Sequence, residues 1–184
     1  MRKTIASLVS LLLISSVFFA PRLSAQAPTP NNVCGETIFA LTLNQRLVSF
    51  NSETPGTLLT SVAITGLQQG ETLIGIDIRP RDRQLYGTTS QNRVVTINPS
   101  TGATTPVITL STPLNGASFG FDFNPRADRL RITSDARQNL RTDVTAAVGN
   151  TTSDGQLTYA ALDPNNAATP RITGSAYTNN FDQS

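Results

Sequence analysis

Histidine and tryptophan are absent from the 184-residue chain, which contains one cysteine and one lysine. Without histidine the chain cannot build a Ser-His-Asp triad, a histidine-ligated zinc or iron site, or an imidazole acid–base step. The single cysteine, Cys34, excludes an internal disulfide framework and a cysteine-rich metal site. The length suits one ordinary domain, and a hydrophobic content of 38% indicates a globular rather than a disordered protein. These absences exclude several classes of enzyme but do not identify an activity.

The N-terminal segment has the three parts of a secretory signal peptide. Residues 1–3 are basic at Arg2 and Lys3, and residues 5–20 form a run without a charge, followed by small residues. A run of 16 residues is shorter than the about 20 that a membrane-spanning helix needs, so cleavage is favoured over anchoring. We therefore predict a signal peptide over residues 1–25, a linker over residues 26–35, and a secreted protein, extracellular or periplasmic.

Removal of this leader changes the charge balance. Residues 26–184 contain eleven arginines, no lysine and twelve carboxylates, which gives a net charge of −1. Binding to nucleic acid or to an anionic membrane surface draws on an excess of positive charge, which the mature chain lacks. We therefore expect no nucleic-acid partner and no membrane association after cleavage.

The remaining chain consists of short alternating runs separated by Gly, Pro and Asn, and parts of it repeat. The sequence of residues 75–80, Gly-Ile-Asp-Ile-Arg-Pro, recurs 45 positions later as Gly-Phe-Asp-Phe-Asn-Pro in residues 120–125, and residues 38–51 overlay residues 85–98 without a gap. Each unit holds about four strands, predicted in its best copy near residues 73–78, 85–89, 93–97 and 105–110. This pattern favours an all-β, β-propeller-like array of four-stranded blades over a β-sandwich.

The array is expected to be incomplete. The first unit lacks the Gly-x-Asp strand that opens the others, and residues 174–179 resemble that strand. Pairing these two parts would close a ring and place Ala176 opposite Phe39. The chain nevertheless holds only about three blades, whereas single-chain propellers have four to eight. We expect a propeller-like domain over residues 36–184 that is truncated at its C-terminus, with an oligomer as the alternative if three blades must close.

The repeated aspartates are predicted to be structural. Alternation places Asp77 and Asp122 on the face opposite to the neighbouring apolar side chains. If each strand forms a hairpin with the next, Asp77 lies opposite Tyr86 and Asp122 opposite Arg131. Both partners can donate to a carboxylate, so we expect two structural pairs, Asp77 with Tyr86 and Asp122 with Arg131.

These motifs resemble an exported bacterial family of unknown function, the 4394 domain. The resemblance rests on residues 128–141, Asp-Arg-Leu-Arg-Ile-Thr-Ser-Asp-Ala-Arg-Gln-Asn-Leu-Arg, on the two Gly-x-Asp strands and on residues 176–180. It extends from about Glu36 to Asn180. The resemblance implies a β-propeller-like, exported protein. It implies no known activity, so no catalytic residue is assigned from it.

The densest polar cluster is the candidate binding site. Arginine forks flanked by amides can hold a carboxylate, a sulfate or the hydroxyls of a sugar. The alternative is a network of structural ion pairs within one blade. The predicted ligand-binding residues are Arg129, Arg131, Asp135, Gln138, Asn139 and Arg141.

The sequence therefore favours a non-catalytic binding or scaffold module for a protein or glycan, at the cell surface or in the periplasm. One alternative is a propeller-type hydrolase or lactonase that depends on carboxylates or a divalent cation. Calcium is then the candidate cofactor, and the suspected residues are Asp122, Asp128, Asp135 and Asn139. The other alternative is an inactive fragment of a longer gene. No catalytic residue and no metal ligand is assigned.

Overall fold

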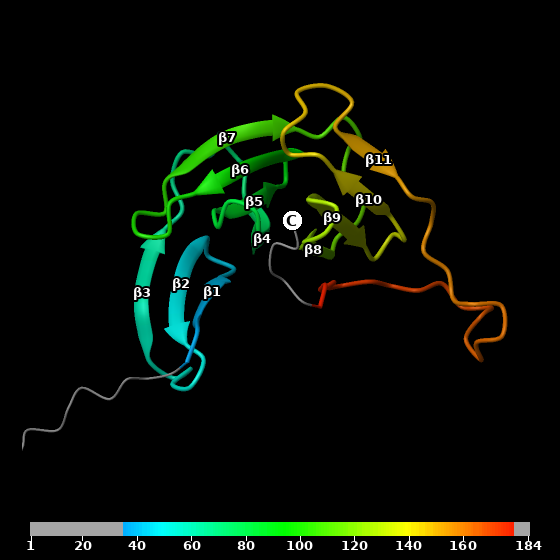
Figure 1. Cartoon of the computed structure of the whole chain (residues 1–184), viewed down its shortest axis with the longest axis horizontal. Helices are drawn as coiled ribbons and strands as arrows, with labels where there is room; N and C mark the ends of the chain where they lie inside the picture. Colours follow the sequence, from blue (N-terminus) through cyan, green and yellow to red (C-terminus); the bar gives the residue numbers. More distant parts are fainter. Residues whose placement is uncertain (1–34, 179–184) are drawn as a thin grey trace, which may run out of the picture. The chain divides into compact units, whose positions relative to one another are not determined.

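The computed structural model describes residues 35–178, which lie within one unit, Val33–Ser184 (Figure 1). These residues form eleven β-strands and no helix, so among them no helix is available that could span a bilayer. The predicted signal peptide, residues 1–25, and all but the last residue of the predicted linker, residues 26–35, lie outside the described residues.

The eleven strands form three antiparallel sheets, in each of which neighbours along the chain are neighbours in the sheet. The first sheet contains β1 (Thr37–Leu41), β2 (Arg46–Asn51) and β3 (Leu58–Ala63). The middle sheet contains β4 (Leu73–Ile78), β5 (Leu85–Thr89), β6 (Arg93–Ile97) and β7 (Thr104–Thr109). The last sheet contains β8 (Phe119–Asn124), β9 (Arg129–Ser134), β10 (Asn139–Thr142) and β11 (Thr151–Ser153).

The all-β prediction is confirmed for the described residues. Three of the four predicted strands of the middle sheet coincide with β4, β5 and β6, and the fourth, β7, begins and ends one residue before the predicted 105–110. The turns explain the agreement. Gln45, Asn92 and Arg137, which precede β2, β6 and β10, all have a positive φ, between 56° and 64°. This left-handed backbone reverses the chain at corresponding points of the three sheets.

Two apolar cores lie on the two faces of the middle sheet. Between the first and middle sheets, Leu47 packs with Leu85, Val95 and Ile97, all at most 5% exposed. Between the middle and last sheets, the core is built from a second set: Tyr86, Val94, Leu110, Phe123, Leu130, Ile132, Leu140 and Val144. The middle sheet is therefore covered on both faces, as β5 shows, because all five of its residues are buried.

The opening strands of the sheets lie closest together. Among the described strands, contacts between different sheets join β4 to β8 and β1 to β4, whereas the far strands β3, β7 and β11 contact only their own sheets. A Cβ at Gly75 would lie 1.7 Å from the side chain of Phe121, so this close approach requires glycine. The three sheets are therefore closest at their first strands, β1, β4 and β8, and splay apart toward their last strands.

The predicted closing strand does not lie where expected. Among residues 35–178 the first sheet has three strands, and no strand pairs with the free edge of β1, so the predicted pairing of Ala176 with Phe39 is absent. Residues 174–178 lie against β8 instead, where a Cβ at Gly120 would come within 2.5 Å of the backbone nitrogen of Ser175. The missing side chain of Gly120 makes room for this segment beside the last sheet.

Candidate functional site

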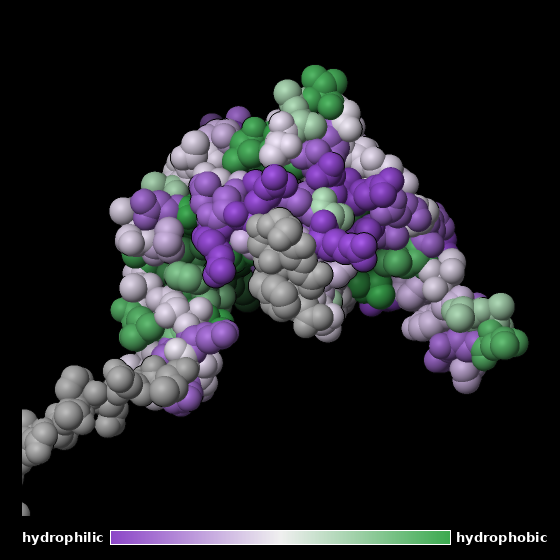
Figure 2. Space-filling model, viewed as in Figure 1, coloured by the Kyte–Doolittle hydropathy of each residue, from purple (hydrophilic) through white to green (hydrophobic). Residues whose placement is uncertain are grey.

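One face of the last sheet is polar across all four of its strands. In β9, Leu130 and Ile132 turn toward the core, so the alternate residues Arg129 and Arg131 point to the opposite face. The strand register places Asn124 opposite Arg129 and Arg141 opposite Arg131. Hydrophilic side chains gather on the surface in Figure 2 over the region where Figure 1 draws β9 and β10.

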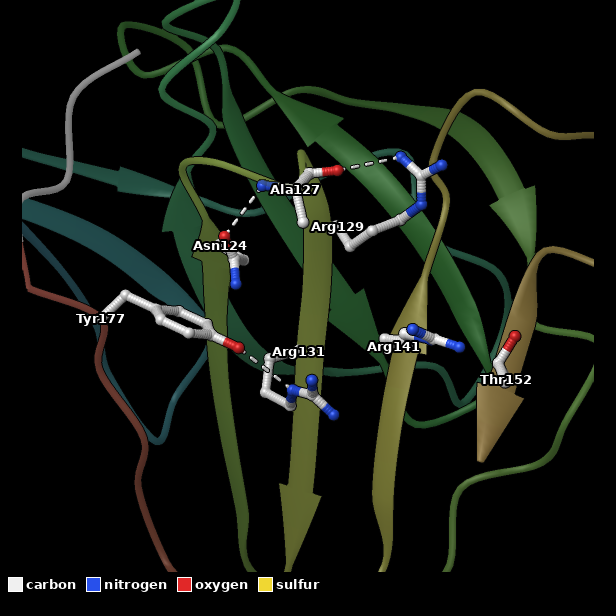
Figure 3. A pocket seen from close by; sticks show the side chains of 7 residues that line it. All are labelled: Asn124, Ala127, Arg129, Arg131, Arg141, Thr152 and Tyr177. Atoms are coloured by element: carbon white, nitrogen blue, oxygen red, sulfur yellow. Dashed lines mark hydrogen bonds between the residues drawn. The ribbon is translucent and has the colours of Figure 1, made fainter. Parts of the chain in front are cut away.

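A cavity of about 500 Å³ opens on this polar face (Figure 3). Its lining residues come from the four strands, from the β8–β9 turn and from the segment that follows β11: Asn124, Ala127, Arg129, Arg131, Arg141, Thr152 and Tyr177. We call this cavity the arginine pocket. Three guanidinium groups in one pocket are unusual because like charges repel, so their counter-charges decide what the pocket can hold.

A single carboxylate links two of the three arginines. Asp154 accepts a hydrogen bond from Arg131 at 2.7 Å and lies 3.2 Å from Nε of Arg141. Arg131 also donates to Asn139 at 2.6 Å and, through Nε, to the Tyr177 hydroxyl at 3.2 Å. Burial alone would lower the pKa of Arg131, but the bonds to Tyr177 and Asp154 outweigh it, and this pKa is raised. Arg131 is therefore the fixed cation of the pocket.

The other two arginines are held less completely. Arg129 pairs with Asp143 at 2.9 Å and donates to the backbone oxygen of Asp128 at 2.9 Å. The side chain of Arg141 is 53% exposed, and its terminal nitrogens have no hydrogen-bond partner within residues 35–178. Among residues 35–178, three guanidinium groups thus face two carboxylates, Asp143 and Asp154. The pocket keeps one positive charge in excess, with donors free to bind an anion.

Tyr177 reaches the pocket because its own backbone is anchored on β8. Its N–H donates to the Asp122 carboxylate, and its hydroxyl accepts from Arg131. Burial raises the pKa of Asp122, although the bond from Tyr177 acts in the opposite direction. The segment after β11 therefore forms one wall of the arginine pocket.

The structure separates the predicted binding residues into two groups. Arg129, Arg131 and Arg141 line the pocket, and Asn139 lies behind Arg131 and orients it. Asp135 and Gln138 belong to the turn between β9 and β10, outside the pocket lining.

Those two turn residues hold the loop that precedes β8. Asp135 accepts the N–H of Ala117 at 2.9 Å and lies 3.4 Å from Arg171, and Gln138 bonds the backbone of Asn115 at 3.0 Å. The bonds to Ala117 and Ser118 lower the pKa of Asp135, as expected for a carboxylate that caps a loop. Both side chains are structural in this arrangement.

For several residues of the arginine pocket, the sequence did not indicate that they belong to a binding site. Asp154 stands in an Asp-Gly turn dipeptide, and Thr152 lies in the Asn-Thr-Thr pattern of a glycosylation sequon. Tyr177 lies in the segment expected to pair with β1. Its likeness to the Gly-x-Asp strands and the family resemblance both marked that segment, but neither says which sheet the segment joins.

The expected register of the aspartates is present, but their hydrogen bonds go elsewhere. Asp77 lies opposite Tyr86, and Asp122 lies opposite Arg131. Tyr86 donates to Asp82 at 2.9 Å, however, and Asp77 accepts the backbone N–H of Phe123 at 2.7 Å. Each carboxylate therefore binds the segment that follows its sheet, β8 for Asp77 and residues 174–178 for Asp122, rather than the residue opposite it. The bond from Phe123 to Asp77 joins two neighbouring sheets. The alternation of side chains within one hairpin does not predict such a bond, because it says nothing about the next sheet.

A buried ion pair crosses from the middle to the last sheet. Arg79 is 6% exposed and binds both carboxylate oxygens of Asp128, with the Nε bond at 2.7 Å. It also pairs with Asp82 at 2.8 Å. The bond to Asp128 is the main cause of the raised pKa of Arg79. Arg79 is therefore enclosed between two sheets.

The residues suspected of holding a divalent cation do not come together. Asp122 binds Tyr177, Asp128 binds Arg79, and Asp135 caps its own loop. Within the described part of the chain no three histidine, cysteine or acidic residues gather in a way that could hold a metal ion.

A comparison with protein families finds a match over most of the chain. A family model described as a domain of unknown function (DUF4394) matches residues 46–184. This range contains the whole lining of the arginine pocket and all strands from β2 onward. No curated protein matches the chain.

Proposed function

Because the chain belongs to the DUF4394 family, whose description assigns no activity, we propose from the site itself that it is a non-catalytic binding module for an anionic group. The observation that carries this proposal is the excess of guanidinium over carboxylate in the arginine pocket. The ligand is a protein or glycan that presents a carboxylate, a sulfate or a phosphate.

The geometry supports recognition of an anion more than chemistry on it. Guanidinium forks bind two oxygens of a carboxylate or sulfate at once, and a rigid sheet holds them in place. Arg131 is fixed by Asn139, Asp154 and Tyr177, whereas Arg141 keeps its terminal donors for the ligand. Thr152 and Asn124 add neutral polar groups at the rim, which suits hydroxyls beside the anion.

The setting of the site is part of the proposal. The three splayed sheets are the blades of a β-propeller-like array, and residues 1–25 export the protein to the cell surface or the periplasm. The four-stranded antiparallel order of the middle and last sheets supports the blades. The basic start and apolar run of the N-terminal sequence support export.

Isothermal titration with sulfate, phosphate and glucuronate, with chloride as the ionic-strength control, tests the binding role. We expect saturable binding of at least one oxyanion, and a loss of about tenfold in affinity for Arg141→Gln. Arg83→Gln, which removes an exposed arginine outside the pocket, is the matched control and leaves the affinity unchanged. An equal loss of oxyanion affinity in the two variants, or no saturable binding of any oxyanion, would contradict the proposal.

A further inference from the structure

The first sheet corresponds to the last three strands of the other two sheets. The gapless overlay of residues 38–51 on 85–98 places β1 at β5 and β2 at β6. Gln45 and Asn92, which correspond in this overlay, share the same left-handed backbone. Among the described residues the first sheet therefore lacks the counterpart of β4 and β8. No strand within residues 35–178 covers this edge of β1.

The counterpart of that strand is found beside the last sheet. Tyr177 donates its N–H to Asp122, as Phe123 donates its N–H to Asp77. The backbone of residues 174–175 lies against Gly120, and at the corresponding place the side chain of Phe121 lies against Gly75. Residues 174–178 thus lie where the first strand of a following sheet would lie, and among the described residues no such sheet follows.

The first sheet also exposes an apolar face that its counterparts bury. Leu85, Val95 and Ile97 of the middle sheet are at most 5% exposed because the first sheet covers them. The corresponding residues of the first sheet are Ile38, Val48 and Phe50, which are only half-buried. A sheet that packed on this face would repeat the contact already made twice in the chain.

Charge complementarity indicates which sheet could pack there. Between the middle and last sheets, Asp128 places its carboxylate on Arg79. In the same alignment Glu36, which is exposed, corresponds to Asp128, and Asn124 of the arginine pocket corresponds to Arg79. If the first sheet of another copy packed against the last sheet, as the last sheet packs against the middle sheet, its Glu36 carboxylate would therefore reach the arginine pocket.

We infer that a second copy of this chain docks in this way, with residues 174–178 of each copy completing the first sheet of the other. Two such contacts related by a two-fold axis would join the three sheets that residues 35–178 of each copy form into one ring of six, within the four to eight blades of propellers. The inference deepens the proposed function, on which it rests, by naming the Glu36 carboxylate of the second copy as an anion held in the arginine pocket.

A disulfide trap tests the exchange of strands in the full chain. Phe39→Cys and Ala176→Cys are introduced together with Cys34→Ser, because Ala176 would face Phe39 as Asp77 faces Tyr86. Facing residues have Cβ atoms about 4.5–5.5 Å apart, close to what a disulfide requires. We expect a covalent dimer under oxidising conditions. Pairing Ala176→Cys with Leu43→Cys, in the exposed turn after β1, is the control that stays uncrosslinked.

The mass of the untrapped protein, measured by light scattering, is expected to be twice that of one chain. Glu36→Gln should weaken the dimer about tenfold, whereas Glu53→Gln, another exposed glutamate, leaves its dissociation constant unchanged. A monomer, or a disulfide formed within one chain, overturns the inference. A monomer that binds sulfate would leave the proposed function standing. Because Glu36 of the other copy fills the arginine pocket in the dimer, the trapped dimer should bind sulfate only after Glu36→Gln. A trapped Glu36→Gln dimer that binds no oxyanion would overturn only the proposed function.

Discussion

The carboxylate of Asp77 on β4 accepts the backbone N–H of Phe123 on β8, at 2.7 Å. The two residues are 46 positions apart in the chain, and the bond joins the opening strands of two neighbouring sheets. Asp122 does the same for Tyr177, in the segment after the last sheet. The Gly-x-Asp motif is therefore a connector: its glycine admits the next strand, and its aspartate binds that strand's backbone.

The glycine of this connector should tolerate no side chain. Gly75→Ala places a methyl group 1.7 Å from the Phe121 ring, so the ring or the strand must move, which costs about 1–3 kcal/mol. Thermal unfolding should show a midpoint lower by about 2–10 °C.

Two further variants test that explanation. Gly56→Ala, where no atom lies within 4 Å of the added methyl group, should unfold as the wild type does. Phe121→Leu combined with Gly75→Ala should recover part of the loss, because the two changes act at one contact. Strictly additive effects would show that the methyl group does not act through Phe121.

The aspartate of the connector should make stability fall as the pH rises through its titration. Burial, and then the neighbouring Asp122 carboxyl, raise the pKa of Asp77 from 3.8 to about 6, against the opposing bond from Phe123. Between these two values the folded protein binds more protons than the unfolded chain, so its free energy of unfolding decreases with increasing pH.

Asp77→Asn keeps an oxygen for the Phe123 N–H and removes this titration. As the pH rises from 4 to 7.5, the melting temperature of Asp77→Asn should therefore increase by about 5 °C relative to that of the wild type. Asp163→Asn, outside all three sheets, is the control. Melting curves of Asp77→Asn and wild type that stay parallel across this range would rule out the raised pKa.

The fold was largely predictable because strand formation depends on local patterns. The alternating apolar residues of β4, β5 and β6 and the turn residues between them mark these strands in the sequence. The pairing of Asp77 with Phe123 was not predictable, because alternation places a side chain on one face of a sheet without saying what packs on that face. The register with Tyr86 was accessible, whereas the hydrogen-bond partner was not.

The binding site was predictable to a similar extent. Arg129 and Arg131 alternate along one strand, and Arg141 follows on the next, so their shared face can be inferred. Asp154 and Tyr177 join them from 23 and 46 residues beyond Arg131. Such contacts depend on the path of the segments after β10, and their composition carries no signal for it.

The ion pair between Arg79 and Asp128 should be a major contribution to the packing of the last two sheets. Asp128→Asn removes one of the two carboxylates that pair with Arg79, a residue only 6% exposed, and leaves Asp82 as its charged partner, so it should cost about 1–3 kcal/mol. Asparagine tolerates the positive φ of 51° at this position, so the loss would reflect the charge.

Urea unfolding measures this cost. Arg81→Gln is the control, because Arg81 also contacts Asp128, at 3.2 Å, but its side chain is 67% exposed and should contribute less than about 1 kcal/mol. If the two substitutions lower the free energy of unfolding equally, the buried ion pair of Arg79 with Asp128 is no stronger than the exposed pair of Arg81 with Asp128.

Neutralising Asp154 should strengthen anion binding. Asp154→Asn leaves an oxygen for Arg131 and raises the charge of the arginine pocket by one. Sulfate affinity, measured by titration calorimetry at low salt, should rise about tenfold and fall more steeply with added salt. Asp163→Asn again serves as the control for a general change of net charge. A fall in affinity would mean that Asp154 positions the arginines more than it competes with the anion.

The most direct test of the account is nuclear magnetic resonance of the arginine side chains during a sulfate titration. The account predicts that the Nε–H signals of Arg129, Arg131 and Arg141 shift together and saturate at one dissociation constant, while those of Arg46 and Arg83 stay in place. Saturation at arginines outside the pocket, or no saturable shift at Arg131 and Arg141, would contradict a binding site on this face of the last sheet.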